Sequence, residues 1–175
     1  MEWPEINQLS EMARLFDGSR YDWLKRSEIP TLIACIERWH PDIAVGGGSC
    51  YLRENFYNDH VQLKGESKKN MLVGLFKNGE QLAGMWSYAQ DPDALYLHGK
   101  LIVIAPQHRS AKLASTVMPL FELVGRAMGA KFLYGLATMK IPHMQHALEA
   151  AGWQLIGFTS GYDREEVAQG DVRRV

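Results

Sequence analysis

A run of apolar residues followed by a short polar turn is the part of this chain whose residue types best suggest chemistry. It reads Leu-Ile-Val-Ile-Ala-Pro-Gln-His-Arg-Ser-Ala-Lys-Leu-Ala-Ser over residues 101–115. The apolar run predicts a strand that reaches Pro106, and the polar turn then opens a helix. The first N–H groups of a helix have no partner inside it, and the helix dipole makes that end positive, so a pyrophosphate fits there. Arg109 and Lys112 would add positive charge.

Two polar side chains of the same expected strand are candidates for the reacting face. Residues of a strand alternate between its faces, so His98 and Lys100 share one face. An imidazole with a pKa near 6.5 is suited to accept a proton at neutral pH, which makes His98 a candidate general base. The alternative is a hydrogen-bonded histidine in a half-buried strand. Lys100 is a poor base unless it is desolvated, so we expect it to face the substrate or to be structural.

The elements that must position these residues alternate in type along the chain. Asn78-Gly79 between two apolar runs predicts a hairpin, and apolar residues at helical spacing predict several helices. The expected helices cover residues 6–16, 32–39, 49–60, 117–128 and 142–151, and the expected strands cover 21–25, 71–76, 81–88, 94–104, 131–138 and 153–162, with a fragment at 172–175. Such an order predicts one α/β (α+β) domain around a mixed, mostly antiparallel sheet flanked by helices.

Length and composition exclude several classes of protein but do not indicate a reaction. The chain has 175 residues, 19 basic against 20 acidic residues, 46% hydrophobic residues and two cysteines. That length suits one domain, and the balanced charge argues against a nucleic-acid partner. No apolar run is long enough to span a membrane. With a polar start and two separate thiols, we expect a cytoplasmic protein.

Around Pro106 the sequence resembles the GNAT (N-acetyltransferase) superfamily. That family ends its fourth strand in an apolar-x-Pro step and continues with Arg/Gln-x-x-Gly-x-Gly/Ala. This chain has Ile104-Ala105-Pro106 and then Arg109 and Ala114, but Lys112 stands at the central Gly. The pyrophosphate-loop motif is therefore degenerate. The order of elements agrees from Tyr21 to Tyr162, and two further weak matches are Gly84 and Gly152-Trp153.

The resemblance implies a fold, a reaction and a set of site residues. It implies a GNAT-like single domain over residues 20–175, after an N-terminal helical extension at 1–19, with a β-bulge and splay at the end of the fourth strand. It implies transfer of acetyl from acetyl-CoA, as co-substrate, to a primary amine by direct attack, without a metal. The amine would belong to a small molecule or a peptide, and a homodimer is possible.

Roles carried over from the family fall on three groups of residues. Backbone groups of Ile102, Val103 and Ile104 would pair with the pantetheine arm, and the N–H of Ile104 would polarise the thioester carbonyl. The acceptor amine would meet Glu54, Trp86, Tyr88 and Tyr162. The pyrophosphate would bind the turn and helix start, namely Arg109, Ser110, Ala111, Lys112, Leu113, Ala114 and Ser115.

The sequence departs from the family pattern at two further positions, and these departures leave other hypotheses about the function possible. Leu148 stands where the family usually has the Tyr that protonates the departing thiolate, and Ile141 stands where it has an Asn. The candidate replacements are Ser110, His143, His146, Tyr134 and Tyr162. A rival hypothesis is a degenerate GNAT-like module that binds CoA or a protein without catalysis. A third keeps the fold but uses a longer acyl or an aminoacyl donor.

Two other motifs have plainer explanations. His143 and His146 are spaced to share one face of a helix, but no third metal ligand is evident, so two surface histidines are expected. Gly46-Gly47-Gly48 precedes a possible helix, yet no clear strand or Gly-Lys-Ser/Thr accompanies it, so a hinge is favoured over a phosphate loop.

Overall fold

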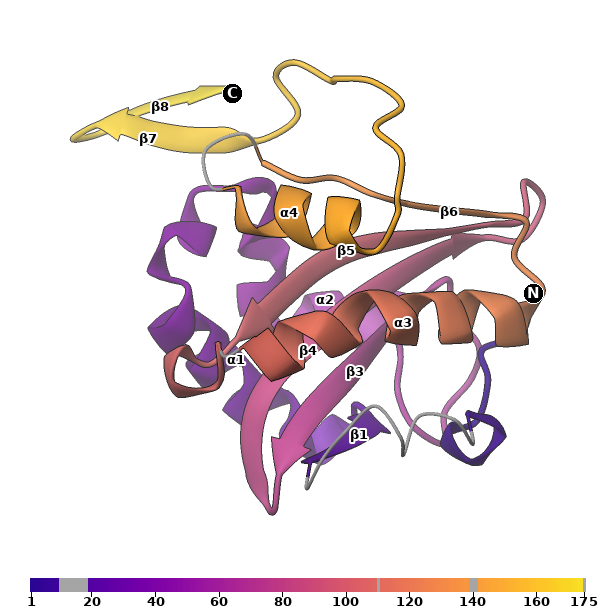
Figure 1. Cartoon of the computed structure of the whole chain (residues 1–175). Helices are drawn as coiled ribbons and strands as arrows, with labels where there is room; N and C mark the ends of the chain where they lie inside the picture. Colours follow the sequence, from indigo (N-terminus) through magenta and orange to yellow (C-terminus); the bar gives the residue numbers. More distant parts are fainter. Residues whose placement is uncertain (10–18, 110, 139–141, 175) are drawn as a thin grey trace.

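Two layers of helices enclose one central sheet. The computed structural model describes residues 1–9, 19–109, 111–138 and 142–174. The sheet has the strand order β1-β3-β4-β5-β6, and β2 pairs with β3 off this path. Helices α3 and α4 cover one face, and α1 and α2 lie behind the other (Figure 1). The bounds are β1 Ser19–Trp23, α1 Ile29–Trp39, α2 Glu54–His60, β2 Val61–Gln62, β3 Met71–Asn78, β4 Gln81–Asp91, β5 Tyr96–Ile104, α3 Ala111–Met128, β6 Phe132–Gly135, α4 His143–Ala150, β7 Arg164–Ala168 and β8 Asp171–Arg174.

The expected hairpin forms the middle of the sheet. Strands β3 and β4 pair antiparallel, and Gly79 in the turn has a φ of 58°, which glycine adopts without strain. Alternate side chains enter two separate cores. Phe76 lies in the core beneath α3, whereas Leu75 lies in the core beneath α1. Both faces of these strands are buried, which explains their nearly continuous apolar sequence.

Helix α3 tolerates a proline in its interior. The helix runs from Ala111 to Met128 with Pro119 inside it, so it begins six residues before the start expected at residue 117. Pro119 is exposed, whereas Leu120 and Phe121 are buried. The carbonyl that loses its helical partner at a proline can therefore be hydrated by water on the outer side.

The N-terminal segment packs onto the domain. Most of the helix expected at 6–16 lies outside the described residues, and the described part contains a short 3₁₀ turn, Ile6–Gln8. The indole N–H of Trp3 donates to the carbonyl of Lys69 at 2.7 Å, and Leu9 is buried in the core beneath α3. Residues 1–9 therefore contribute to the same core as the rest of the chain.

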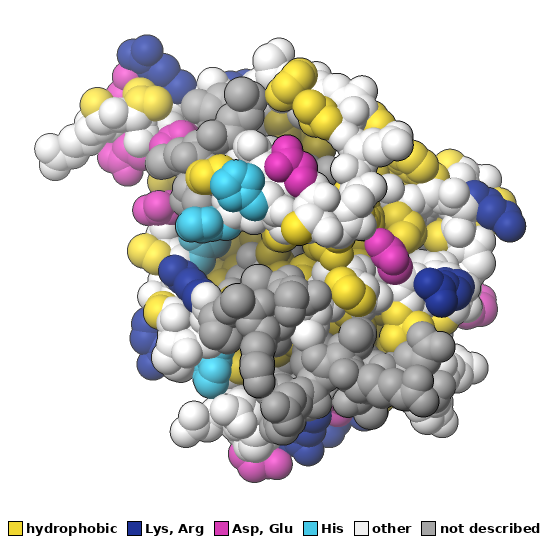
Figure 2. All heavy atoms as spheres, in the orientation of Figure 1, with side chains coloured by type: hydrophobic (Ala, Val, Ile, Leu, Met, Phe, Trp, Pro, Cys, Tyr) yellow, Lys and Arg dark blue, Asp and Glu magenta, His cyan; other side chains and the backbone are white. Residues whose placement is uncertain are grey.

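The strand expected at 153–162 does not form, and this prediction was wrong. After α4 the chain runs without a ladder until β7, and it exposes Leu155, Ile156 and Phe158 by 75%, 77% and 77%. Figure 2 shows hydrophobic side chains gathered in the upper right, where this segment lies in Figure 1. The apolar pattern was read correctly as non-helical, but pairing needs a neighbouring strand that the pattern cannot specify.

The end of the chain forms a hairpin of its own. Strands β7 and β8 pair antiparallel in a separate two-stranded sheet. Residues 172–174 of the fragment expected at 172–175 are thus part of β8 and do not extend the central sheet, and residue 175 lies outside the described residues. None of the helices in the described ranges combines the length and the apolar character that crossing a bilayer requires.

Candidate active site

A β-bulge interrupts β5 at Lys100. Ser87 of β4 is opposite Leu101 and Tyr88 is opposite Gly99, so Lys100 is an extra residue without a partner position on β4. The Ser87 hydroxyl fills the break: it accepts a hydrogen bond from the N–H of Leu101 at 3.1 Å. It also lies 2.6 Å from the buried hydroxyl of Tyr51. A bulge at the strand that the resemblance singled out is therefore present.

Beyond the bulge, β5 separates from β6. The parallel ladder between them ends at Gly99 and Gly135, five residues before β5 itself ends. On the other side, β5 stays paired with β4 through Gly84 and Ile104. The two neighbouring strands therefore splay apart along the second half of β5.

The pairing with β4 fixes which backbone groups of β5 point to the splayed edge. The N–H of Ala105 donates to the carbonyl of Ala83, 2.9 Å away. In an antiparallel ladder, positions that bond across the pair alternate with positions whose N–H and C=O point outward. Ile104 and Ile102 therefore direct their backbone groups toward the β6 side. Val103 directs its own toward β4, and its side chain is buried in the core beneath α1, so its expected pairing with pantetheine does not fit this arrangement.

The turn after β5 leads directly to the start of α3. A 3₁₀ turn covers Pro106–His108, and α3 begins at Ala111. Ser110 lies outside the described residues, as do the side chains of the helix residues 111–115. The positive end of an 18-residue helix thus lies next to the open edge of β5.

Arg109 holds this turn in place. Its Nε donates to the carbonyl of Ile104 at 3.0 Å, and its terminal NH₂ group donates to the carbonyl of Trp39 at 2.8 Å. The guanidinium thereby links the end of β5 with the end of α1. The charge expected to face a pyrophosphate is bonded to the protein's own backbone.

His98 is a covered, neutral histidine. Its side chain is 7% exposed and its ring stacks on Tyr134, with centroids 4.2 Å apart. Burial, assisted by the positive charge of Lys100, lowers the pKa of His98 to about 4. This corrects the expected value near 6.5: the imidazole is free of a proton at pH 7, but it is a weak base.

On the same face as His98, the segment just before β7, which contains Tyr162 and Asp163, approaches β5. Lys100 Nζ donates to the Tyr162 hydroxyl at 3.5 Å. Next to it, Asp163 accepts the N–H of Gly47 at 2.5 Å and that of Arg164 at 2.8 Å. Tyr162 therefore lies beside the bulge.

The triple glycine has a packing role. A Cβ at Gly46 or Gly47 would come within 3.2 Å of the Asp163 carboxylate, and one at Gly48 would come within 2.8 Å of Ile43. The N–H of Gly47 meets the chain's own carboxylate rather than a phosphate. The glycines thus allow two segments to approach closely.

Two aromatic residues expected to line the acceptor site are core residues instead. Trp86 and Tyr88 are 3% and 0% exposed and pack with Phe121 of α3. Tyr88 also lies 2.8 Å, hydroxyl to hydroxyl, from Tyr21. Ser87, which lies between them on β4 and points to the opposite face of the sheet, is the residue beside the bulge. The sequence analysis missed Ser87 and Tyr51, whose roles depend on contacts across the sheet.

Glu54 is exposed at the start of α2. It helps line an open hollow of about 490 Å³ with Arg53, Asn55, Phe56, Asp59 and His60. Among the described residues, its carboxylate makes no hydrogen bond or ion pair with β5 or with Tyr162. The structure thus brings His98, Lys100 and Tyr162 together, and leaves Glu54 on the outer side of its helix.

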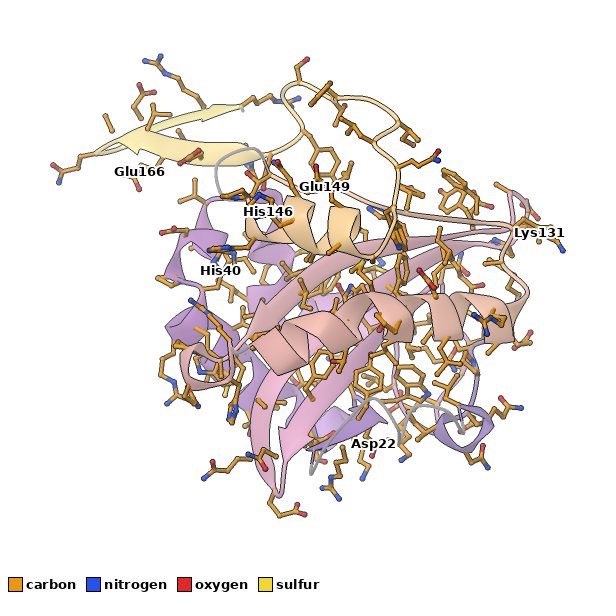
Figure 3. The ribbon with its side chains drawn as sticks, in the orientation of Figure 1. Asp22, His40, Lys131, His146, Glu149 and Glu166 are labelled. Atoms are coloured by element: carbon orange, nitrogen blue, oxygen red, sulfur yellow. The ribbon has the colours of Figure 1, made fainter. Side chains whose placement is uncertain are left out.

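Two other features of the sequence can be placed in the structure: Leu148 and Ile141, which stand where the family has a Tyr and an Asn, and the pair His143 and His146. Leu148 packs against the core beneath α3, and Ile141 lies outside the described residues. His146, labelled in Figure 3, lies on α4. Within the described part of the chain, His, Cys, Asp and Glu side chains form no group of three suited to a metal ion.

Solved structures provide the comparison with known proteins, since no family model and no curated sequence matches. Spermidine/spermine N-acetyltransferase SpeG from Vibrio cholerae is 14% identical, with a TM-score of 0.65 over 82% of this chain and 84% of that one. AAC(6')-Iy, solved in complex with the bisubstrate analogue CoA-S-monomethyl-acetylneamine, is 11% identical, with a TM-score of 0.57 over 82% of this chain and 95% of that one. Ribosomal-protein-S5-alanine acetyltransferase from Vibrio fischeri is 13% identical, with a TM-score of 0.65 over 84% and 85%. This chain therefore has the fold of GNAT acetyltransferases, which confirms the fold class expected from sequence.

Proposed function

We propose that this protein is an acyl-CoA-dependent N-acyltransferase that acetylates a primary amine. The proposal rests on one observation above all: Ile102 and Ile104 direct backbone groups to an edge that β6 leaves beyond Gly135. The N-terminus of α3 lies next to that edge. An extended, amide-bearing arm that ends in a pyrophosphate requires both features, polar backbone along its length and a positive helix end.

Each part of the proposed site has a separate task. Acetyl-CoA supplies a thioester carbonyl, which a neutral amine attacks so that a C–N bond forms, the C–S bond breaks and the amine loses a proton. The Ile104 N–H is the proposed donor to the carbonyl oxygen, a type of contact whose loss costs about 2.7–4 kcal/mol of barrier. The Ile102 backbone would hold the arm. The amides from Arg109 through the first turn of α3, residues 109–115, would hold the pyrophosphate, with Arg109 positioning the turn.

The attacking amine must lose a proton, and His98 is the described side chain closest in type to a general base on this face. His98 is neutral at pH 7, as a base must be, yet a pKa of about 4 makes it a weak acceptor. We therefore assign His98 a minor part in proton removal, with solvent as the main acceptor. The thiolate leaves unprotonated or takes its proton from water, since Leu148 offers none.

A second candidate is a GNAT-like module that binds CoA without acetylating an amine. The engagement of the Arg109 guanidinium by Ile104 and Trp39, together with Leu148 at the acid position, favours it. An exposed apolar segment, Leu155–Phe158, would suit contact with a protein. We also propose that this chain forms a homo-oligomer, because Vibrio cholerae SpeG, which has the same fold, has been solved as a dodecamer.

Isothermal titration with acetyl-CoA tests the proposal directly. We expect saturable binding at micromolar to low millimolar cofactor, and no heat of binding at millimolar acetyl-CoA would overturn it. An acceptor panel assayed by release of free thiol then separates the two candidates. Binding with slow hydrolysis and no acetylated amine would favour the module, and faster turnover with a longer acyl-CoA would replace acetyl as the transferred group.

A further inference from the structure

Lys100 holds an unusual position for a surface lysine. It is the extra residue of the β5 bulge, on the face that carries His98 and Tyr134. Because a strand rises about 3.3 Å per residue, it lies about 7 Å along the chain from Ile102, where the proposed edge begins. The segment that carries the positive charge and the proposed reacting edge are therefore neighbours.

The charge of Lys100 acts on the groups around it. It lowers the pKa of His98, after burial, and it opposes the rise that burial causes in the pKa of Cys50. Its Nζ atom lies 3.5 Å from the Tyr162 hydroxyl. A positive charge is thus present among a thiol, a hydroxyl and a neutral imidazole.

The described carboxylates leave this charge without a counterion. No ion pair joins Lys100 to an acidic residue within the described ranges. Six other lysines and arginines each pair with Asp or Glu there, namely Arg20, Arg26, Lys64, Lys68, Lys77 and Arg173. Asp163, which follows Tyr162 in the sequence, is bonded to the N–H groups of Gly47 and Arg164. An anionic group of the substrate could therefore form an ion pair with the Lys100 ammonium.

We propose that the acceptor is a small amine that also carries a carboxylate, an amino acid in chemical class, and that Lys100 binds this carboxylate beside Tyr162. The inference rests on the proposed function and specifies its substrate. The same charge disfavours a polycationic acceptor, because like charges at close range repel, and more strongly where water is partly excluded. Lys100 is thus a specificity residue that touches the substrate.

The experiment compares matched acceptors and matched variants. Each L-amino acid of a panel is assayed against its own carboxamide, which keeps the amine and removes the negative charge, with spermidine as a polycation. The variants are Lys100→Ala and Lys100→Glu. Lys131→Ala is the control, since Lys131 is exposed and directly precedes β6, at the far end of the sheet (Figure 3).

We expect the wild type to acetylate at least one amino acid with a kcat/KM about 10- to 100-fold above that of its carboxamide, the range for a hydrogen bond to a charged group. Lys100→Ala should abolish this preference through KM, Lys100→Glu should reverse it toward spermidine, and Lys131→Ala should leave it unchanged. All three variants should bind acetyl-CoA within about twofold of the wild type.

Other outcomes overturn the inference. It fails if carboxamides or spermidine are acetylated as well as amino acids, if Lys100→Ala keeps the preference, or if acetyl-CoA binds and no amino acid is acetylated. In each of these cases acetyl-CoA binding still supports a CoA-dependent protein. Loss of acetyl-CoA binding in the wild type is a different result, which overturns the proposed function itself.

Discussion

The side-chain hydroxyl of Ser87 on β4 accepts the backbone N–H of Leu101 on β5, 3.1 Å away, where the register between the two strands breaks. A side chain thus replaces the backbone partner that the bulge removes. Ser87 is fully buried and lies 2.6 Å from the Tyr51 hydroxyl, which is also buried. The splayed edge and the position of Lys100 both depend on this small polar cluster.

Replacing Ser87 should therefore destabilise the domain. Ser87→Ala leaves the Leu101 N–H and the Tyr51 hydroxyl without this partner, and each unsatisfied buried group costs about 1–3 kcal/mol. We expect a loss of about 2 kcal/mol in the free energy of unfolding, measured by urea denaturation. Ser67→Ala, at an exposed loop position, is the matched control and should change it by less than about 0.5 kcal/mol. Equal stability of the two variants would show that the cluster does not support the bulge.

His98 should make the domain less stable in mild acid. Its pKa is about 4 in the folded protein and near 6.5 in the unfolded chain, so the unfolded chain binds more protons between these values. The contribution of neutral His98 to the free energy of unfolding is therefore fully present above pH 6.5, and it is lost as the pH falls toward 4. We expect a loss of about 2 kcal/mol from His98, allowing for partial contact with solvent. Denaturation of wild type and His98→Gln at pH 4.5 and 7.5 measures it, and an identical pH dependence of the two proteins would contradict it.

The same residue should matter little for turnover. A well-matched general base contributes about 10²–10⁴-fold, and a base with a pKa of about 4 contributes less at neutral pH. We expect His98→Ala to lower kcat about tenfold and to leave the Kd of acetyl-CoA unchanged. Steady-state kinetics from pH 5 to 9 provide the measurement. An unchanged kcat would remove His98 from the reaction, and a 10³-fold loss would make it the principal base.

Arg109 should be needed to position the turn before α3. Arg109→Ala removes the bonds to the carbonyls of Ile104 and Trp39, so the turn amides lose a fixed orientation. We expect about tenfold weaker binding of acetyl-CoA, measured by titration calorimetry, and about 1–2 kcal/mol lower stability. Arg126→Ala, exposed near the end of α3, is the control. If Arg109→Ala weakens binding without any loss of stability, the guanidinium contacts phosphate directly rather than positioning the turn.

Gly84 should tolerate no side chain. A Cβ there would lie 2.7 Å from the carbonyl oxygen of Val103, which is backbone and cannot rotate away. We expect Gly84→Ala to cost about 1–3 kcal/mol in unfolding free energy, the range for overpacking. At Gly135 the nearest atom to such a Cβ is 3.8 Å away, so Gly135→Ala should be nearly neutral in stability. Thermal unfolding of both variants provides the measurement, and equal melting temperatures of the two would contradict the prediction.

Local patterns predicted the elements whose partners lie nearby in sequence. The hairpin of β3 and β4 follows from turn residues between two apolar runs, and α3 follows from its apolar face. The open turn after Pro106 was also predictable, because a strand, a proline and a helix start are adjacent there. The strand expected at 153–162 failed because an apolar run becomes a strand only where another strand accepts its hydrogen bonds.

The amino-acid sequence by itself determined the fold class, the segment proposed to bind the cofactor and the shared face of His98 and Lys100. Only the tertiary structure decided which side chains lie beside the bulge of β5 and which are buried beneath α3. Alternation places Trp86 opposite Ser87, but packing against α3 buries Trp86 and leaves Ser87 beside the bulge. It also decided the protonation of His98, because the stacking of Tyr134 and the resulting desolvation arise from a parallel pairing between distant strands. Burial and long-range contact set these properties, and neither is a property of residue type or spacing.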